Sequence, residues 1–414
     1  MAQINQRSKD AATFVGTEQV FATEPAGPLM QRAFPIEGSF VAELEQTELE
    51  NLEESVDLFD NKATVRGLKG GTVKMDFYAR VPAIPLSASV TPIPHYLGTI
   101  LNTALGASAS DAGSVTDATV STTAIDVAAG TGALFEQGQW IGVQVAGAIE
   151  PARITTIATD TLTVYPQFSA TPTAAGGLVF NSYTYAPEPD HTSTLHIQHA
   201  KSAANGSGLQ WSISGSTCNI GFDIKRNELA KVTMEGQVGS WQGPGNYNFT
   251  TSSAADSMSA PFAVRDAVTL FQSNATTTRT SYCLISADIK LNGGMEHVEC
   301  LGATEGKSGA FRKGQRIFAE ATLKFRFDNA IDATNWTDQT LMSCIVMIPK
   351  GTLLNRRWFI LDIPSCRIVG KPKLSDENGM LYMEATVVAT MDKVTTQSAI
   401  PTSIEAAPFR VALI

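Results

Sequence analysis

The chain has 414 residues, of which 43% are hydrophobic and 17% charged, with a formal net charge of −10. This length allows two or three domains, and the composition excludes a disordered chain. The negative charge argues against nucleic-acid binding driven by counterion release, although an acidic surface also suits a channel through which DNA slides. The low charge content and the many Thr, Ser, Ala, Val and Gly residues favour a mainly β protein with buried surface between subunits.

The N-terminal segment, residues 1–30, is polar and interrupted by Gly and Pro, so we expect an extended arm over a neighbouring surface. Its first ten residues lack the apolar core of a signal peptide, and no apolar run approaches the ~18 residues of a membrane span. The five cysteines contain no CxxC motif. We therefore expect buried free thiols in a reducing cytoplasm and no membrane insertion.

The hexamer TVKMDF at residues 72–77 alternates apolar and polar side chains and returns as TLKFRF at residues 322–327. This alternation is typical of a strand with one buried face, so Val73, Met75 and Phe77 are expected to point inward.

Two further blocks repeat around the hexamers. An alternating segment precedes each hexamer, and a cysteine followed by a Met-Glu strand comes after it. The matched segments are 40–45 with 287–292, 218–220 with 366–368, and 232–238 with 381–387. Three matched blocks in one order indicate an internal duplication, and the period is too long for a solenoid repeat.

The two copies are expected to differ between their blocks. Residues 94–106 are predicted to form a short amphipathic helix, with Pro near its start and Gly at its end. Residues 107–187 contain no Lys and have several short strand patterns, whereas the second copy has only a brief connection at this point. We therefore predict an inserted small β domain. The expected division is a first domain of 1–106 and 188–245, an insert of 107–187, a linker of 246–262 and a second domain of 263–414.

Each copy also contains a long loop between its first two strands, at residues 48–69 and 300–314. Hairpin loops of about 2 to 5 residues are usual. Long ordered loops commonly have a function, so an intersubunit role is expected here.

Several possible sites of chemistry are not favoured. The segment GATEGKS at 302–308 has three residues between its glycines, where a P-loop needs four, and is expected between two strands. His196 and His199 point to opposite faces of a predicted strand, so these residues and His191 are expected to be structural. Cys218 and Cys366 occupy equivalent positions, which favours core packing. Without a GxSxG, HExxH or dinucleotide motif, we expect no enzyme, no metal and no cofactor.

Taken together, each copy has an alternating strand, a long loop, a hexamer strand, a helical or irregular connection and a closing pair ending in Met-Glu-x-x-Val. This arrangement resembles the tail tube protein family, the major tail proteins of long-tailed bacteriophages. The insert is similar to small β modules found in such virion proteins. The resemblance covers most of the chain and depends on pattern and order.

The resemblance implies a β-sandwich or barrel flanked by a helix, whose sheets join into rings of six tube domains. A chain with two such domains would close the ring as a homotrimer with pseudo-six-fold symmetry. Stacked rings would conduct DNA during ejection. The implied partners are other copies of the chain, the tape-measure protein and double-stranded DNA in the lumen, and the tail terminator and distal tail proteins at the ends. The implied location is the virion tail, assembled in the host cytoplasm.

Two sets of residues follow from this expectation. The outward rows of the repeated strands are expected to face the lumen, and the charged residues of the long loops are expected to bridge successive rings. The lumen-facing candidates are Ser39, Glu43, Glu45, Thr72, Lys74 and Asp76 in the first copy and Ser286, Asp288, Lys290, Asn292, Thr322, Lys324 and Arg326 in the second. The ring-stacking candidates are Glu50, Glu53, Glu54, Asp57, Asp60, Lys62, Arg66 and Lys69, then Glu305, Lys307, Arg312 and Lys313.

Other functions remain open. The inner tube of a contractile tail and a distal tail protein share the fold, and fold alone does not fix the role. A bacterial adhesin built of β domains is disfavoured by the N-terminus and the unpaired cysteines. A carbohydrate-active enzyme is disfavoured because no pair of carboxylates in distinct environments stands out.

Overall fold

The structure is a computed structural model of the chain. It describes residues 6–18, 20–23, 25, 30–49, 65–81, 95–110, 113–180, 182–188, 190–203, 208–246, 259–273, 281–291, 294–300, 303, 306–312, 319–326, 341–352, 355–377, 379–390, 404–405 and 407–414. Most of these residues are in β-strands, which confirms the mainly β fold. Among them, no helix is long and apolar enough to cross a membrane.

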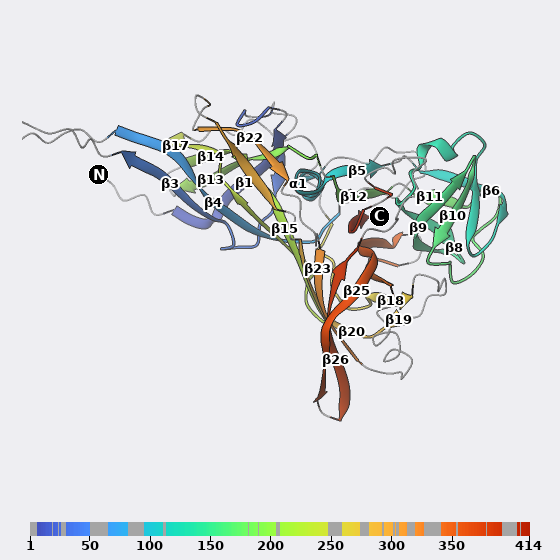
Figure 1. Ribbon diagram of the computed structural model, residues 1–414. Coiled ribbons are helices and arrows are strands. Elements are labelled where there is room, and N and C mark those ends of the chain that lie inside the picture. The colour runs from blue at the N-terminus through green and yellow to red at the C-terminus, as the bar shows by residue number, and fades with distance from the viewer. Residues whose placement is uncertain are drawn as a thin grey trace, which may run out of the picture.

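One large sheet joins 14 of the described strands and runs through the centre of the molecule (Figure 1). Eight of its strands are neighbours in two groups of four. The first strand set is β3 (Val41–Leu49), β4 (Val65–Tyr78), β16 (Lys231–Gln237) and β15 (Asn219–Lys225). The second strand set continues the sheet as β20 (Leu284–Leu291), β23 (Ala319–Arg326), β26 (Met380–Ala389) and β25 (Arg357–Glu377).

The hexamers and the Met-Glu segments occupy matching positions in these two sets, but the other two expected matches were wrong: Asp288 corresponds to Glu43 and not to Val41, and Ile220 corresponds to Leu374 and not to Ile368. Lys74 of the first hexamer pairs with Glu235, and Lys324 of the second hexamer pairs with Glu384. Likewise Glu43 pairs with Thr72, and Asp288 pairs with Thr322. The apolar residues of both hexamers are buried, because alternate side chains of each strand point into the core. The order of strands in the first set is therefore followed by the same order in the second.

A second sheet packs against the first strand set to form a sandwich. Its order is β17 (Ser240–Asn246), β14 (Gly208–Ser216), β13 (Thr194–Ala203), β1 (Gln6–Glu18) and β2 (Gln31–Ala33). Val15 and Ile197 of this sheet share one core with Met75 and Phe77. The expectation of an arm over residues 1–30 was wrong for β1, which pairs with β13 of its own chain.

Helix α1 (Tyr96–Leu105) closes one end of this sandwich, as the sequence predicted. His95 caps it, since Nδ1 of His95 accepts a hydrogen bond of 2.9 Å from the backbone N–H of Gly98. Gly106, with a φ of 100°, ends it in a conformation that side chains rarely adopt.

The second strand set also packs in two layers, and the long strand β25 contributes to both of them. The first part of β25 pairs with β24 (Met342–Lys350), which continues to β18 (Val268–Ser273) and β19 (Ser281–Tyr282). From Arg367 onward β25 pairs with β26, and this hairpin projects from the body of the molecule (Figure 1). Phe271 of β18 packs on Phe325 of β23 with ring centroids 5.8 Å apart, so the two layers share one core.

Residues 114–180 contain a closed six-stranded barrel, drawn at the right of Figure 1. Its strands are β6 (Ser114–Val120), β7 (Ala124–Val127), β8 (Trp140–Val145), β9 (Ala148–Ala158), β10 (Thr161–Tyr165) and β11 (Leu178–Phe180), with the 3-10 turn η2 (Gly132–Leu134). On either side of the barrel, β5 (Gly106–Ser110) pairs with β12 (Tyr183–Pro187). The C-terminal strand β27 (Arg410–Leu413) lies between β12 and β25.

Strand β17 lies at the end of the expected first domain. One further expectation needs correction. None of the five cysteines forms a disulfide, and Cys218, Cys344 and Cys366 are buried as expected, but Cys300 is exposed. Cys300 directly follows β21 (Met295–Glu299), which forms a short hairpin with β22 (Lys307–Arg312) in which polar residues predominate.

Candidate assembly surface

The polar rows of the two strand sets lie on one face of one sheet. Asp76 pairs with Thr233, Thr233 with Gly221, and Gly221 with Lys290 of the second set. Directly paired residues point to the same side, so the outward rows are continuous across the junction between β15 and β20. The lumen-facing candidates on this face are Glu43, Glu45, Thr72, Lys74, Asp76, Ser286, Asp288, Lys290, Thr322, Lys324 and Arg326.

Two candidates fall elsewhere. Ser39 precedes β3, and its hydroxyl donates to the backbone oxygens of Ile36 (2.7 Å) and Asp76 (3.2 Å). Asn292 lies outside the described residues.

Charges of both signs lie on this face, and some of them form ion pairs with near neighbours. Lys231 Nζ lies 2.8 Å from Asp76 Oδ2, and Lys290 Nζ lies 3.6 Å from Asp288 Oδ2. The second pair is mostly solvent-exposed, and exposed ion pairs of this kind contribute about 0 to 1 kcal/mol. The face is therefore a hydrated surface of alternating charge, suited to contact without tight binding.

The β21–β22 hairpin covers one end of this face. A cavity of about 450 Å³ lies between them. Carboxylates gather around it from both sides: Glu43, Glu45, Glu296 and Glu299, with Thr72, His297 and Lys307 beside them. No group of His, Cys, Asp and Glu among the described residues has the geometry of a metal site.

Two cations of this hairpin attach it to the first half of the chain. Lys307 Nζ donates to the backbone oxygen of Val238 at 2.9 Å, and Arg312 Nε donates to that of Glu188 at 3.0 Å. Arg312 Nη2 also donates to the last carbonyls of α1, those of Ala104 and Leu105. Burial lowers the pKa of Arg312 to about 10, and the guanidinium stays charged at neutral pH.

These contacts change the interpretation of the second long loop. Lys307 and Arg312 were expected to bridge successive rings, whereas the structure directs both into their own chain. Their geometry instead holds the hairpin of the second half against the first half. The Lys307 side chain is also bound to carbonyl oxygens, which is unlike the phosphate-binding lysine of a P-loop.

The remaining ring-stacking candidates are largely outside the described part of the chain. Lys69 is the exception: its Nζ donates to the backbone oxygen of Trp241 at 3.1 Å and lies 5.2 Å from the centroid of the indole. Arg66 belongs to β4, and nothing is described of its side chain. Those beyond the described residues are Glu50, Glu53, Glu54, Asp57, Asp60, Lys62, Glu305 and Lys313.

A buried polar cluster beside β13 contains the residue types of a nucleophilic triad. His196 Nε2 lies 3.2 Å from Ser212 Oγ, and His196 Nδ1 lies 3.5 Å from Glu18 Oε1. However, Nδ1 is also 3.0 Å from Ser214 Oγ, and Glu18 accepts hydrogen bonds from the backbone N–H of Gly215 at 2.9 and 3.0 Å. These residues line neither the cavity beside the β21–β22 hairpin nor the cavity beside β2 that is described below. The cluster is therefore a structural network between strands.

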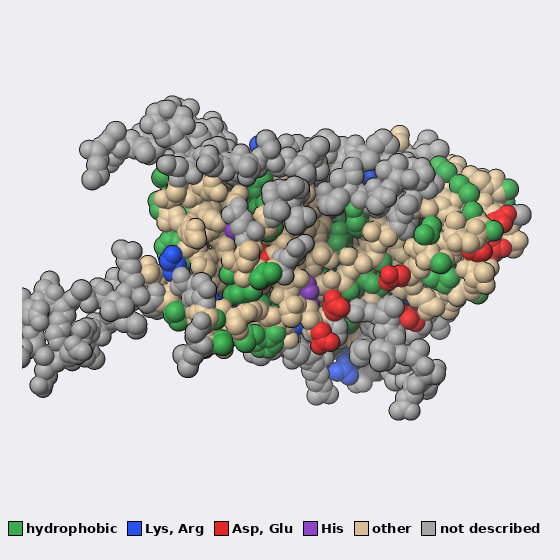
Figure 2. All heavy atoms as spheres, turned by 90° about the horizontal axis from the view of Figure 1, so that it is seen from above, with side chains coloured by type: hydrophobic (Ala, Val, Ile, Leu, Met, Phe, Trp, Pro, Cys, Tyr) green, Lys and Arg blue, Asp and Glu red, His purple; other side chains and the backbone are tan. Residues whose placement is uncertain are grey.

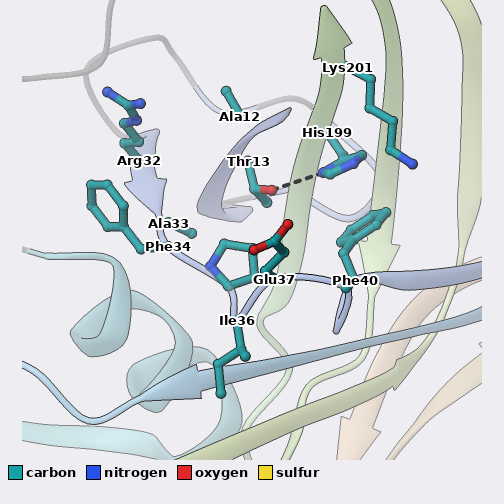
Figure 3. A pocket seen from close by; sticks show the side chains of 12 residues that line it. Ala12, Thr13, Arg32, Ala33, Phe34, Ile36, Glu37, Phe40, His199 and Lys201 are labelled. Atoms are coloured by element: carbon teal, nitrogen blue, oxygen red, sulfur yellow. Dashed lines mark hydrogen bonds between the residues drawn. The ribbon is translucent and has the colours of Figure 1, made fainter. Parts of the chain in front are cut away.

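The other two histidines of the sequence cluster are also held within the chain. His191 Nε2 lies 2.6 Å from the backbone oxygen of Thr103. His199 Nδ1 lies 2.9 Å from Thr13 Oγ1, and the ring of Phe40 stacks on the imidazole with centroids 3.8 Å apart (Figure 3). Burial lowers the pKa of His199 to about 4, so its imidazole is neutral at physiological pH.

His199 lines a cavity of about 350 Å³ between β2, the following loop and β13 (Figure 3). Arg32, Glu37 and Lys201 bring charges of both signs to its walls, and Phe34 and Phe40 bring apolar surface. The Thr13 hydroxyl is paired with the His199 imidazole, but His199 Nε2 has no hydrogen-bond partner among the described residues. The third group that would orient the base in a catalytic triad is therefore lacking.

A buried charge network joins the barrel to the main sheet. Asp362 of β25 is fully buried and accepts hydrogen bonds from Trp140 Nε1 (2.9 Å) and Arg153 Nη1 (3.0 Å) of the barrel. Arg410 Nη1 of β27 lies 3.5 Å from the same carboxylate. Apolar residues of both parts surround it, among them Ile149 and Phe180 of the barrel and Ile360 of β25.

The barrel is therefore attached to the main sheet by buried contacts. Arg153 is its single Lys or Arg and is buried, while Asp117 and Glu136 are exposed. Figure 2 shows acidic side chains gathered at this end of the molecule. Part of the net negative charge thus lies on the barrel.

The two ends of the paired strand sets are open. Among the described strands β3 pairs with β4 alone, and β25 beyond Arg367 pairs with β26 alone. Unpaired strand edges readily pair with another chain. Comparison with protein-family models and with curated proteins found no match to this chain.

Proposed function

We propose that this chain is a structural virion protein of a long-tailed bacteriophage and forms the tail tube as stacked rings. One observation carries the proposal. The order β3-β4-β16-β15 is followed without a break by β20-β23-β26-β25, so the first set already pairs edge to edge with the second. Repeating that junction between chains would extend the sheet around a ring.

The proposed ring contains three chains, because each chain supplies two strand sets and the family arrangement has six tube domains. The continuous polar face lines the lumen in this arrangement. Its mixed, exposed charges suit passage of the tape-measure protein and of double-stranded DNA without sequence-specific binding. The acidic barrel then lies away from the lumen, where it is free to decorate the tail.

Electron microscopy of the purified full-length chain at high concentration tests this function. We expect hollow tubes whose rings contain three chains related by three-fold symmetry. Rings of six chains would overturn the trimer and keep the tube. Monomers at every concentration, with no ring or tube, would overturn the function.

A further inference from the structure

The repeat gives each position of the first strand set a counterpart in the second. Met234 lies opposite Met75, and Met383 lies opposite Phe325, at matching positions of the two hexamers. One strand further along, Ile220 pairs with Met234 and Leu374 pairs with Met383. Leu374 is therefore the counterpart of Ile220. By the same register, Leu381 is the counterpart of Val232, since each lies two residues before its methionine.

These counterparts differ sharply in burial. Ile220 is 5% exposed and Val232 0%, whereas Leu374 is 60% exposed and Leu381 39%. All four belong to the core side of the sheet, the side of Met234 and Met383. The projecting β25–β26 hairpin thus presents core-type residues to solvent.

The first strand set shows what normally covers this position. The ring of Phe222 packs against Phe359 and Phe409 of the second half, with centroids 6.2 and 5.7 Å apart. The backbone N–H of Ala230 donates to the oxygen of Phe262 at 2.9 Å. The first set is therefore covered at this end in part by residues 262, 359 and 409, which come after it in the chain, and no further segment comes after the second set to cover it within the chain's described residues.

We infer that a second copy of this chain supplies the missing cover. Its β3 pairs antiparallel with β25 beyond Arg367, and the rest of its first half packs over Leu374 and Leu381. This inference rests on the proposed ring and names the residues of its interchain joint. The internal junction favours the same partner: β20, which pairs with β15 inside the chain, is the counterpart of β3, and β15 is the counterpart of β25.

The internal junction also fixes the register of the joint. Gly221 of β15 pairs with Lys290 of β20. Their counterparts are Ser375, which lies opposite Tyr382, and Glu45, which lies opposite Gly70. Ser375 of one chain thus faces Glu45 of the next. Directly opposed residues have Cβ atoms about 4.5–5.5 Å apart, within reach of a disulfide.

The test is a cysteine cross-link between Ser375→Cys and Glu45→Cys, in a background in which the exposed Cys300 is replaced by serine. Cys283, which is partly exposed, is replaced by serine as well, and the buried Cys218, Cys344 and Cys366 are kept. Mixing the two chains, each with one introduced cysteine, under mild oxidation should give disulfide-linked heterodimers. The matched control pairs S375C with V41C, which lies four residues along β3 and is displaced by about 13 Å. Equal cross-linking in both mixtures, or none with Glu45→Cys, would overturn the joint.

A second measurement needs no disulfide. Leu374→Asp with Leu381→Asp should weaken self-association roughly tenfold or more in sedimentation velocity, because two apolar side chains lose their cover. Leu134→Asp, at an exposed apolar position of the barrel (52% exposed), should leave association unchanged. Unaltered association of the double variant would contradict the inference. If the chain forms tubes in electron microscopy but the cysteine pair does not cross-link, only this joint is rejected. If the pair cross-links but no tubes form, only the tail-tube function is rejected.

Discussion

The inserted barrel closes on itself, whereas the main sheet has strand edges without a described partner, among them β3 and the end of β25. Closure gives each barrel strand a neighbour on both sides, and residues such as Ile141, Val143 and Leu162 form its core. The main sheet leaves β3 and the end of β25 open, with core-type leucines bare beside the second edge. The barrel strands therefore leave no edge open for another chain, whereas the main sheet has edges at which another chain can pair.

The two regions are also joined in different ways. The barrel is fixed to the sheet by the buried carboxylate of Asp362 and the cations around it. The two strand sets are joined by a backbone ladder between β15 and β20, with Lys307 and Arg312 reaching across. The buried charge network requires the particular side chains around Asp362. Backbone pairing such as that between β15 and β20 can also form between chains at an open strand edge.

The largest expected effect comes from breaking the joint to the barrel. Asp362→Ala leaves Arg153 and Arg410 buried without their carboxylate, and loss of one partner of a buried ion pair costs about 3–5 kcal/mol. We expect the free energy of unfolding to fall by that amount in urea titrations. Glu136→Ala, at an exposed carboxylate of the barrel, should change it little. Equal stability of the two variants would show that Asp362 does not hold the barrel.

The second-largest expected effect is a difference between the two regions in their stability at low pH. All five histidines lie outside the barrel, and burial lowers the pKa of His95 and of His199 to about 4 each. The unfolded chain binds these protons below about pH 6.5, so stability is complete above that pH and falls as the pH drops toward 4. Each histidine contributes on the order of 3 kcal/mol across this window.

Hydrogen exchange at pH 7 and pH 5 measures this difference. We expect protection of α1 and β13 to decrease first, while β8 and β9 of the barrel keep theirs. His95→Asn preserves an acceptor for the helix cap and removes one titrating group, so it should flatten the pH dependence. A barrel that loses protection as early as α1 would contradict the comparison.

The sequence predicted the parts of this structure that depend on local pattern. The hexamers and Met-Glu segments were placed in register because period-two alternation reports the buried face of a strand, and α1 was found from its apolar spacing. The joint to the barrel was missed. A signal was present: Asp362 and Arg410 are lone charges within apolar strands, and such residues are buried only with a partner.

The contacts of the β21–β22 hairpin carried no such signal. Lys307 and Arg312 stand in a polar segment that looks like any solvated loop, and their acceptors are backbone carbonyls, which sequence does not distinguish. Only the three-dimensional arrangement brings the end of α1 to Arg312. The same loop was therefore assigned to contacts between rings.

The smallest expected effect sharpens the role of this hairpin. Arg312→Met keeps the apolar stem of the side chain and removes charged donors from the carbonyls of Ala104, Leu105 and Glu188. Hydrogen bonds to charged groups contribute about 1.5–3 kcal/mol, so we expect a loss of roughly that size in urea unfolding. Lys290→Met, on the exposed face, is the matched control and should stay within about 0.5 kcal/mol. If Arg312→Met instead leaves stability intact but stops ring stacking, the hairpin belongs to the contacts between rings, as the sequence first predicted.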